Sequence, residues 1–162
     1  MSGESPIYRQ NPIALTRLGN AGSSFWISPC PVLFDQSSKI LIADDEKLVR
    51  NTLRSLLSDK ANCKVYEAVD GRAAVEETRR VKPDVAILDI VMPVMSGIEA
   101  AYEVRRLAPD TKIILMSSHY TAEEAAVLAR LFGDGNFIAK SEMGKDLVPA
   151  INRLLPEESQ FV

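Results

Sequence analysis

Residues 85–100 read VAILDIVMPVMSGIEA and hold the most specific pattern in the sequence. Its first four residues form a short apolar run rich in branched side chains, as in a buried strand. Asp89 follows directly and is itself followed by apolar residues, where an unpaired buried carboxylate would be costly. Ser96 and Glu99 then fit a capping box at the start of a helix. The stretch therefore predicts a buried strand, an aspartate with a specific role and a following helix.

The alternation of strand and helix extends through most of the chain. Short apolar runs occupy 39–43, 63–69, 85–88, 112–116 and 136–139. Between and after them, apolar residues recur at helical spacing on single faces: Val49, Leu53, Leu56 and Leu57; Ala125, Leu128, Ala129 and Phe132; Leu147, Ile151, Leu154 and Leu155. Because each parallel crossover needs a helix-sized connection, this alternation predicts an α/β fold whose parallel sheet is covered on both faces.

The composition of the runs predicts the order of the strands. The first, third and fourth runs are continuously apolar, as central strands are, whereas the second alternates with polar residues like an edge strand. With right-handed crossovers, this pattern favours a doubly wound (βα)5 sheet with the order 2-1-3-4-5. Further helix boundaries are predicted at Asp70, at Thr121 with Glu124, and at Gly133.

The composition excludes several classes of protein. A length of 162 residues suits one domain, and a net charge of −3 argues against a broad surface for nucleic acid. No apolar run approaches the roughly 18 residues of a membrane span, and no secretory signal pattern opens the chain. Two cysteines without CxxC spacing and a single histidine do not suit a Cys/His metal site. We therefore expect a cytoplasmic globular protein.

The chain divides by composition into a tail, a domain and a short end. Of residues 1–37, 13 are Pro, Gly or Ser and no helical or alternating period persists, so we predict a flexible N-terminal extension. The domain is expected over 38–156, and residues 157–162 are expected to be a short C-terminal tail. Since no helix-turn-helix pattern follows the domain, we expect its output to reside in a separate partner.

Polar residues follow four of the predicted strands. Asp44 and Asp45 come after the first, Asp89 ends the third, Ser117 follows the fourth and Lys140 follows the fifth. In a doubly wound sheet, ligands bind outside the carboxyl ends of the strands. We therefore expect three carboxylates, a hydroxyl and an ammonium group to meet at one edge, although each residue alone has a plainer explanation. Asp45 could cap the next helix, and Lys140 could extend its amine to solvent.

The three carboxylates need a compensating charge. Two of them about 4 Å apart repel by roughly 4 kcal/mol at an effective dielectric constant near 20. Either one takes up a proton, or a divalent cation lies among them. A cluster of hard oxygen ligands suits Mg²⁺, which also accepts phosphate oxygens. Lys140 and Ser117 could then contact a phosphoryl group, and an aspartate could attack phosphorus and hold it as an acyl phosphate.

At these residues the chain resembles the receiver (CheY-like) domain of two-component response regulators. The resemblance runs from about residue 38 to 156 through ILIADDEKLVRNTL, VAILDIVMPVMSGIEA, IILMSS and FIAKS. It implies that Asp89 is the phosphorylated residue and that Asp45 and Asp89 bind Mg²⁺ directly, with Asp44 acting largely through water. It also implies that the backbone carbonyl of Val91 binds the ion and that Ser117 and Lys140 contact the phosphoryl oxygens.

The resemblance also assigns residues that adjust the response. Ser117 and Phe137 occupy the positions of the conformational switch, where phenylalanine in place of tyrosine leaves a switch by packing alone. Val91 and His119 flank the site and are expected to tune water access, and hence the lifetime of the phosphate. Ser141 stands where proline is usual, so the cis bond often found there is not implied.

We therefore expect a single-domain response regulator that accepts a phosphoryl group from a histidine kinase or phosphotransferase. It would act as a regulatory phosphoprotein that catalyses its own phosphorylation and dephosphorylation, rather than as an enzyme with a separate substrate. Its partner would bind the face made by the fourth helix, the fifth strand and the fifth helix, and it would be a monomer or weak dimer without direct contact to nucleic acid or membrane. The alternatives are an interaction module independent of phosphorylation and an aspartate-nucleophile phosphohydrolase.

Overall fold

The computed structural model describes residues 37–58, 63–121 and 136–155, together with 123, 124, 127 and 130. These residues contain five strands: β1 (Ser38–Ala43), β2 (Cys63–Ala68), β3 (Val85–Asp89), β4 (Lys112–Ser117) and β5 (Asn136–Ala139). All neighbouring strands pair in parallel, in the order β2-β1-β3-β4-β5. The predicted fold and strand order are confirmed, and β2 lies at an edge as its alternating sequence indicated.

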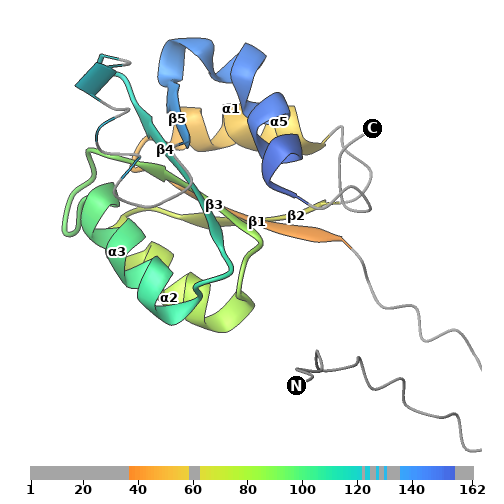
Figure 1. Cartoon of the computed structure of the whole chain (residues 1–162), viewed down its shortest axis with the longest axis vertical. Helices are drawn as coiled ribbons and strands as arrows, with labels where there is room; N and C mark the ends of the chain where they lie inside the picture. Colours follow the sequence, from red (N-terminus) through yellow and green to blue (C-terminus); the bar gives the residue numbers. More distant parts are fainter. Residues whose placement is uncertain are drawn as a thin grey trace, which may run out of the picture. The chain divides into compact units, whose positions relative to one another are not determined.

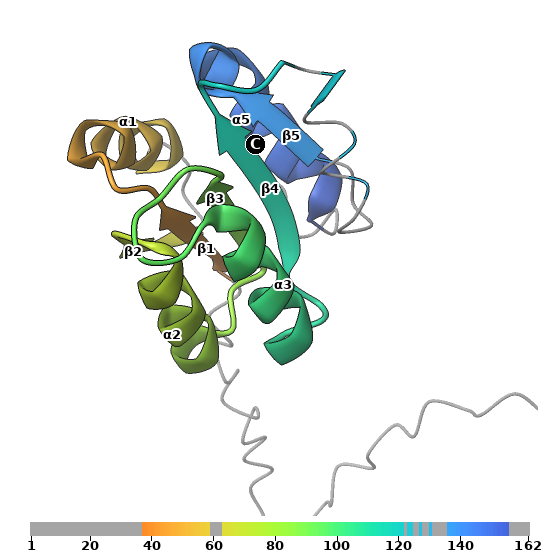
Figure 2. The same ribbon diagram turned by 90° about the vertical axis from the view of Figure 1, so that its left-hand side faces the viewer.

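Helices cover both faces of the sheet. The helices α1 (Lys47–Ser58) and α5 (Met143–Leu154) pack on one face, and α2 (Gly71–Val81) and α3 (Gly97–Leu107) pack on the other (Figures 1 and 2). A short 3-10 turn, η1 (Lys140–Glu142), connects β5 to α5. This is the layer arrangement expected when every connection between parallel strands crosses over through a helix.

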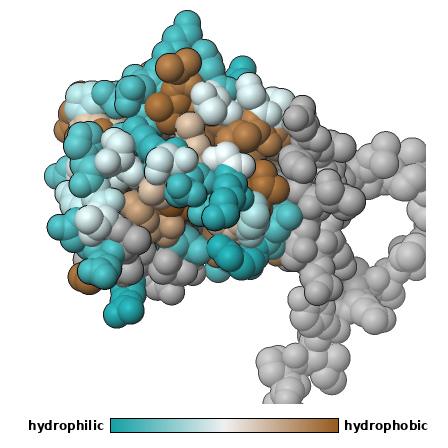
Figure 3. All heavy atoms as spheres, turned by 90° about the horizontal axis from the view of Figure 1, so that it is seen from above, coloured by the Kyte–Doolittle hydropathy of each residue, from teal (hydrophilic) through white to brown (hydrophobic). Residues whose placement is uncertain are grey.

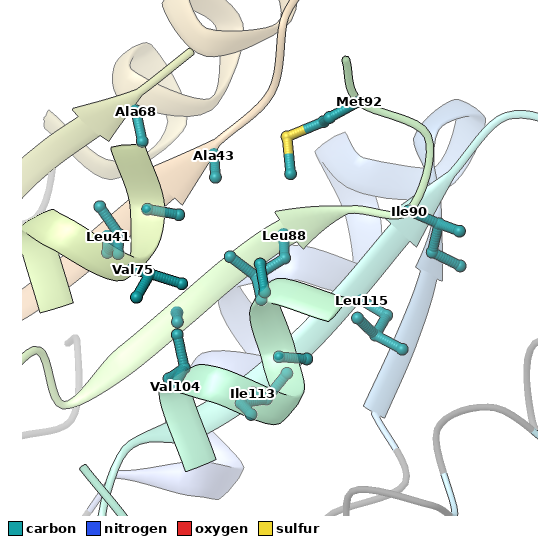
Figure 4. Packing of buried hydrophobic residues seen from close by; sticks show 14 residues of the cluster. Leu41, Ala43, Ala68, Val75, Leu88, Ile90, Met92, Val104, Ile113 and Leu115 are labelled. Carbon is teal, nitrogen blue, oxygen red and sulfur yellow. The ribbon is translucent and has the colours of Figure 1, made fainter. Parts of the chain in front are cut away.

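The period of two along each central strand builds two separate cores. Leu41, Leu88 and Leu115 face α2 and α3, where they pack with Val75 and Val104 (Figure 4). The intervening side chains face α1 and α5 and form the second cluster, which includes Ile40, Ile42, Ile87, Ile114, Leu53, Leu147 and Ile151. Because both faces of β1, β3 and β4 are buried, these strands read as continuous apolar runs in the sequence.

One face of the described surface is mixed in polarity. On the face seen from above the view of Figure 1, polar and apolar side chains are interspersed (Figure 3). No helix among the described residues is long and apolar enough to cross a membrane.

The predicted helix caps are present wherever the structure describes them. The Asp70 carboxylate accepts a hydrogen bond from the Ala73 amide, and Ser96 and Glu99 form a complete capping box at α3. Thr121 and Glu124 exchange the same reciprocal pair of hydrogen bonds. The stop predicted at Gly133 and the apolar stripe at Ala125, Leu128, Ala129 and Phe132 lie outside the described residues.

The chain divides into two units, Met1–Val32 and Leu33–Val162, and every described residue belongs to the second. The predicted N-terminal extension therefore lies outside the described residues except for Ser37, and the C-terminal tail at 157–162 lies wholly outside them. Among the described peptide bonds none is cis, including the bond between Lys140 and Ser141.

Two glycines fix the loop that connects β3 to α3. The Gly97 amide donates to the Ile90 carbonyl at 3.0 Å, and a Cβ atom at Gly97 would overlap the carbonyl oxygen of Asp89. The Gly71 amide at the start of α2 donates to the Met95 carbonyl at 3.2 Å, and a Cβ there would overlap the same carbonyl. Both glycines are needed for close backbone approach, and together they define the path of the chain after Asp89.

Candidate phosphoacceptor and metal site

The pairing of β1 with β3 brings two distant aspartates together. In this parallel pair Ala43 lies opposite Leu88, so the next residues along the two strands are Asp44 and Asp89. Likewise Ser117 lies opposite Ala139, the residue before Lys140. The convergence that strand positions predicted from the sequence is thus produced by register at the carboxyl edge of the sheet.

Three carboxylates gather at this edge. One oxygen from each of Asp44, Asp45 and Asp89 lies within 4.8 Å of the others. Asp44 is 1% exposed and Asp89 4% exposed, whereas Asp45 is open to solvent. Two of the three acids are therefore removed from water, which strengthens their repulsion and makes a cationic partner necessary.

Lys140 supplies one such charge. Its Nζ atom lies 2.8 Å from an oxygen of Asp44 and 3.1 Å from an oxygen of Asp89, and a third carboxylate, that of Glu46, lies 3.5 Å away. Burial acts to lower the pKa of Lys140, but the hydrogen bonds and charges of Asp44 and Asp89 outweigh it and raise the pKa above its ordinary value. Lys140 is thus held as an ammonium ion between two buried acids, and it is not a lysine extended into solvent.

The environment of Asp89, in contrast to that of Lys140, disfavours the charged form of the side chain. Burial raises the pKa of Asp89 above its ordinary value, and the charge of Asp44 adds to the increase. The hydrogen bond and charge of Lys140 and a backbone hydrogen bond from Val91 offset part of it. The single lysine therefore does not fully compensate the buried charge of Asp89.

The donor set fits a magnesium ion. Oxygen ligands about 2.1 Å from an octahedral ion lie between about 3 and 4.2 Å apart. Carboxylate oxygens within 4.8 Å of one another need only a small shift, or one bridging water, to reach that spacing. Asp44 already accepts hydrogen bonds on both oxygens, one from Lys140 and one from the Glu46 amide at 2.9 Å. Asp89 likewise accepts hydrogen bonds from Lys140 and from the Val91 amide, so direct ligation by Asp45 and Asp89, with Asp44 acting through water, stays a prediction.

The sequence left open that Asp45 caps the helix after β1. In the structure the contact at the entry to this helix is made by Asp44 instead. Asp44, not Asp45, accepts the hydrogen bond from the amide two residues ahead, at the entry to α1. A carboxylate that accepts from the amide two residues ahead forms an Asx turn, here at the residue that immediately precedes α1. Asp45 is left with its carboxylate exposed at the site.

The remaining predicted residues surround the acids. Ser117 is buried, and its Oγ atom accepts a hydrogen bond from the His119 amide at 3.1 Å. Val91 and His119 are both exposed, and their predicted role in tuning water access stays a prediction. Phe137 is half-buried and packs, together with Tyr120, against the core cluster on the α2 and α3 side.

Sequence reasoning missed three charged residues near the site. Glu46 contacts Lys140, and Arg50 donates to the backbone carbonyls of Asp44 and Asp45. Glu67, at the end of β2, forms an ion pair with Arg50. Glu46 directly follows the acid pair, so its place in the sequence was a usable signal. Arg50 and Glu67 gave none, because their meeting depends on how α1 packs beside β2.

The comparison with a protein-family model and with relatives of known sequence identifies the family. The model of the response regulator receiver domain matches residues 40–152. The chemotaxis protein CheY of Thermotoga maritima is 33% identical over 117 residues, which cover 72% of this chain and 96% of CheY. The response regulator protein VraR of Staphylococcus saprophyticus is 31% identical over 76% of this chain, and the match spans only 59% of VraR.

Solved structures show the same fold. The response regulator domain of Thermotoga maritima CheB has a TM-score of 0.67 at 29% identity and is matched over 73% of this chain and 96% of its own. The receiver domain of the regulator NarL from Mycobacterium tuberculosis has a TM-score of 0.64 at 32% identity, over 72% and 94% of the two chains. With the sheet order, the acidic edge and the family match in agreement, this chain belongs to the response regulator receiver domain family.

Proposed function

We propose that this protein accepts a phosphoryl group on Asp89 from a phosphohistidine of a histidine kinase or phosphotransferase, in a Mg²⁺-dependent reaction. One observation carries the proposal. The buried Asp89 carboxylate lies at the sheet edge in contact with Lys140 and within 4.8 Å of two further carboxylates. Membership of a two-component signalling family supplies the class of donor.

In the proposed step, a carboxylate oxygen of Asp89 attacks the phosphorus of the donor. The phosphorus–nitrogen bond breaks, its electron pair returns to the imidazole nitrogen, and that nitrogen takes up a proton as the neutral histidine is released. Bound Mg²⁺ would supply positive charge that neutralises the transferring oxygens. Asp89 is oriented by Lys140 and by the Val91 amide, so the chain contributes mainly positioning and charge compensation.

Phosphorylation of Asp89 would change the negative charge that lies next to Lys140 and Ser117. The phosphoryl group carries a charge of about −1.5 to −2 and three acceptor oxygens, and it replaces the single negative charge of the Asp89 carboxylate. Lys140, which now bridges Asp44 and Asp89, can follow the added charge, and the Ser117 hydroxyl has a proton to donate while its oxygen accepts from His119. A shift of Ser117 toward the phosphoryl group would exchange the hydrogen bond with His119 for a charged one, which is the stronger kind.

We propose that the signal leaves through the face that includes β5 and α5. Phe137 lies on β5 opposite Leu115 of β4. Leu115 precedes Ser117 by two residues on the same strand. A movement of Ser117 therefore acts on the strand next to Phe137, and repacking of that half-buried ring would alter the surface that a downstream partner contacts. The fourth predicted helix, which would complete this face, lies largely outside the described residues.

The proposal is tested by incubating the full chain with Mg²⁺ and acetyl phosphate and measuring the intact mass. The wild-type protein is expected to gain one phosphate that is lost in acid and in base, as an acyl phosphate is. Asp89→Asn should gain none, because an amide cannot form the acyl phosphate. Asp110→Asn is the matched control, since Asp110 is an exposed aspartate that precedes the opposite end of β4.

Two results would contradict the proposal. One is a phosphate on Asp89→Asn equal to that on the wild-type chain. The other is a wild-type chain that remains unmodified at millimolar Mg²⁺ and phosphodonor while its circular dichroism shows a folded protein. The Asp110→Asn control should gain the same amount of phosphate as the wild-type chain.

A further inference from the structure

Arg50 is a buried cation next to the acidic edge that the proposed phosphotransfer step does not use. It lies in the first turn of α1 and is 9% exposed. Its Nη1 atom donates to the Asp44 carbonyl at 2.8 Å and to the Asp45 carbonyl at 3.2 Å. One guanidinium nitrogen thus holds the backbone of both residues that carry the acid pair.

These hydrogen bonds act on the path of the loop. Asp44 and Asp45 lie between the end of β1 and the start of α1, where the strand ladder has ended and the helix has not begun. The bond from Arg50 to the Asp44 carbonyl is buried, so that carbonyl would lack a water molecule as a substitute partner. The planar guanidinium of Arg50 can donate to both carbonyls and keep its Nε–H group for another partner. The ammonium group of a lysine lacks this fixed planar arrangement of donors.

Arg50 is itself oriented by β2. The Nε atom donates to a Glu67 carboxylate oxygen at 3.3 Å, and the other oxygen of Glu67 pairs with Arg54 at 2.8 Å. The neighbouring residue Ala68 accepts a hydrogen bond from the Asp44 amide at 3.3 Å. The end of β2 therefore anchors the acid loop twice, once through its backbone and once through Glu67 and Arg50.

We propose that Arg50 is a positioning residue that holds Asp44 and Asp45 at the spacing required for one Mg²⁺ ion, and that Glu67 orients Arg50 for this purpose. This inference rests on the proposed function, because it concerns the same metal site. Arg50 acts through the two backbone carbonyls and contributes no ligand. Its role resembles that of residues behind metal ligands in general, whose loss typically weakens metal binding 10- to 100-fold.

The direction in which Mg²⁺ affinity changes when Arg50 is replaced distinguishes a positioning role from an effect of its charge. Arg50 carries a positive charge beside a site for a divalent cation, so removal of that charge alone would strengthen cation binding. A positioning role predicts the reverse, because the acid loop would lose the hydrogen bonds that fix its two carbonyls. A purely structural role predicts a lower melting temperature with unchanged affinity in the folded protein.

The test is a calorimetric titration of the full unphosphorylated chain with Mg²⁺, repeated with Mn²⁺, beside a thermal melt of each variant. Arg50→Gln is expected to weaken binding of both ions about 10-fold. Arg50→Lys should recover part of the affinity, because its ammonium can reach one carbonyl but not replace the planar fork. Arg54→Gln is the matched control, since Arg54 pairs with the same Glu67 but lies on the exposed side of α1, and it should bind both ions like the wild type.

The outcomes distinguish this proposal from the proposed function. If the wild-type chain binds neither ion, the metal site itself is contradicted. If the wild type binds and Arg50→Gln binds equally or more tightly, only the role of Arg50 is overturned. Should Arg50→Gln fail to fold, Glu67→Gln answers the same question. It should weaken binding in the same direction by a smaller factor, and an unchanged affinity would overturn the proposal.

Discussion

At the scale of single residues, the place of Asp89 depends on the backbone that follows it. The chain leaves β3, turns, and returns so that the Gly97 amide donates to Ile90 at 3.0 Å. The Gly97 Cα then lies against the carbonyl of Asp89, with no room for a side chain. The glycine four residues after Pro93 therefore supports the position of Asp89, although it carries no chemistry of its own.

Gly97→Ala is expected to disturb both stability and phosphorylation. An added Cβ would lie 2.7 Å from the carbonyl carbon of Asp89, so the backbone of β3 or of α3 must move. Overpacking of this kind costs about 1–3 kcal/mol, and it displaces Asp89 from Lys140. Chemical denaturation should show the lower free energy of unfolding, and phosphorylation by acetyl phosphate should be slower in the folded variant.

Gly144→Ala provides the control for this prediction. Gly144 lies in the first turn of α5, and a Cβ there would meet no atom within 4 Å. Since alanine is a better helix former than glycine, by up to about 1 kcal/mol in a helix interior, this variant should be as stable as the wild type or more stable. Equal behaviour of the two alanine variants would show that close packing at Gly97 is not required.

At the scale of elements, the capping box of α3 makes part of the stability dependent on pH. The backbone amide of Ser96, and then its hydroxyl, donate to the Glu99 carboxylate and lower the pKa of Glu99 below its ordinary value of 4.5. A group with a lowered pKa in the folded state stabilises the protein above its ordinary pKa and loses that contribution as the pH falls through the lowered value. The start of α3 should therefore weaken in acid.

Glu99→Gln is expected to reduce the free energy of unfolding at pH 7, and the difference from the wild type should shrink as the pH falls below 4.5. The reason is that a protonated Glu99 and a glutamine are both uncharged and form weaker bonds to Ser96. Urea denaturation across this range measures the difference directly. Glu76→Gln, on the exposed surface of α2, serves as the control, and a gap for Glu99→Gln that stays constant with pH would refute the explanation.

The elements show which features the sequence could predict. Strands came from continuous or alternating apolar runs, and the start of α3 from Ser96 and Glu99, because each signal is local to a few residues. The backbone conformation of Val94 was not predictable from a local signal of this kind. It adopts a φ of 67° in the loop after β3, a left-handed conformation that costs a residue with a side chain about 1–2 kcal/mol. Only the closure of that loop against α2 and α3 explains it.

At the scale of the whole molecule, the site is a consequence of parallel register. Asp44 and Asp89 are 45 positions apart, and the pairing of β1 with β3 places them side by side. Strand order and strand ends were enough to predict that convergence and the place of Lys140. The pair formed by Arg50 and Glu67 was not predictable, because it depends on the packing angle between α1 and the edge strand β2, for which the sequence has no periodic signal.

Locating the phosphate on the chain decides whether Asp89 is the residue that is phosphorylated. The full chain would be phosphorylated with acetyl phosphate and Mg²⁺, reduced with borohydride, which converts an aspartyl phosphate to homoserine, and sequenced by tandem mass spectrometry. We predict homoserine at position 89 alone, and none when a chelator removes Mg²⁺. Homoserine at position 44 or 45, or modification that persists in the chelator, would contradict the account.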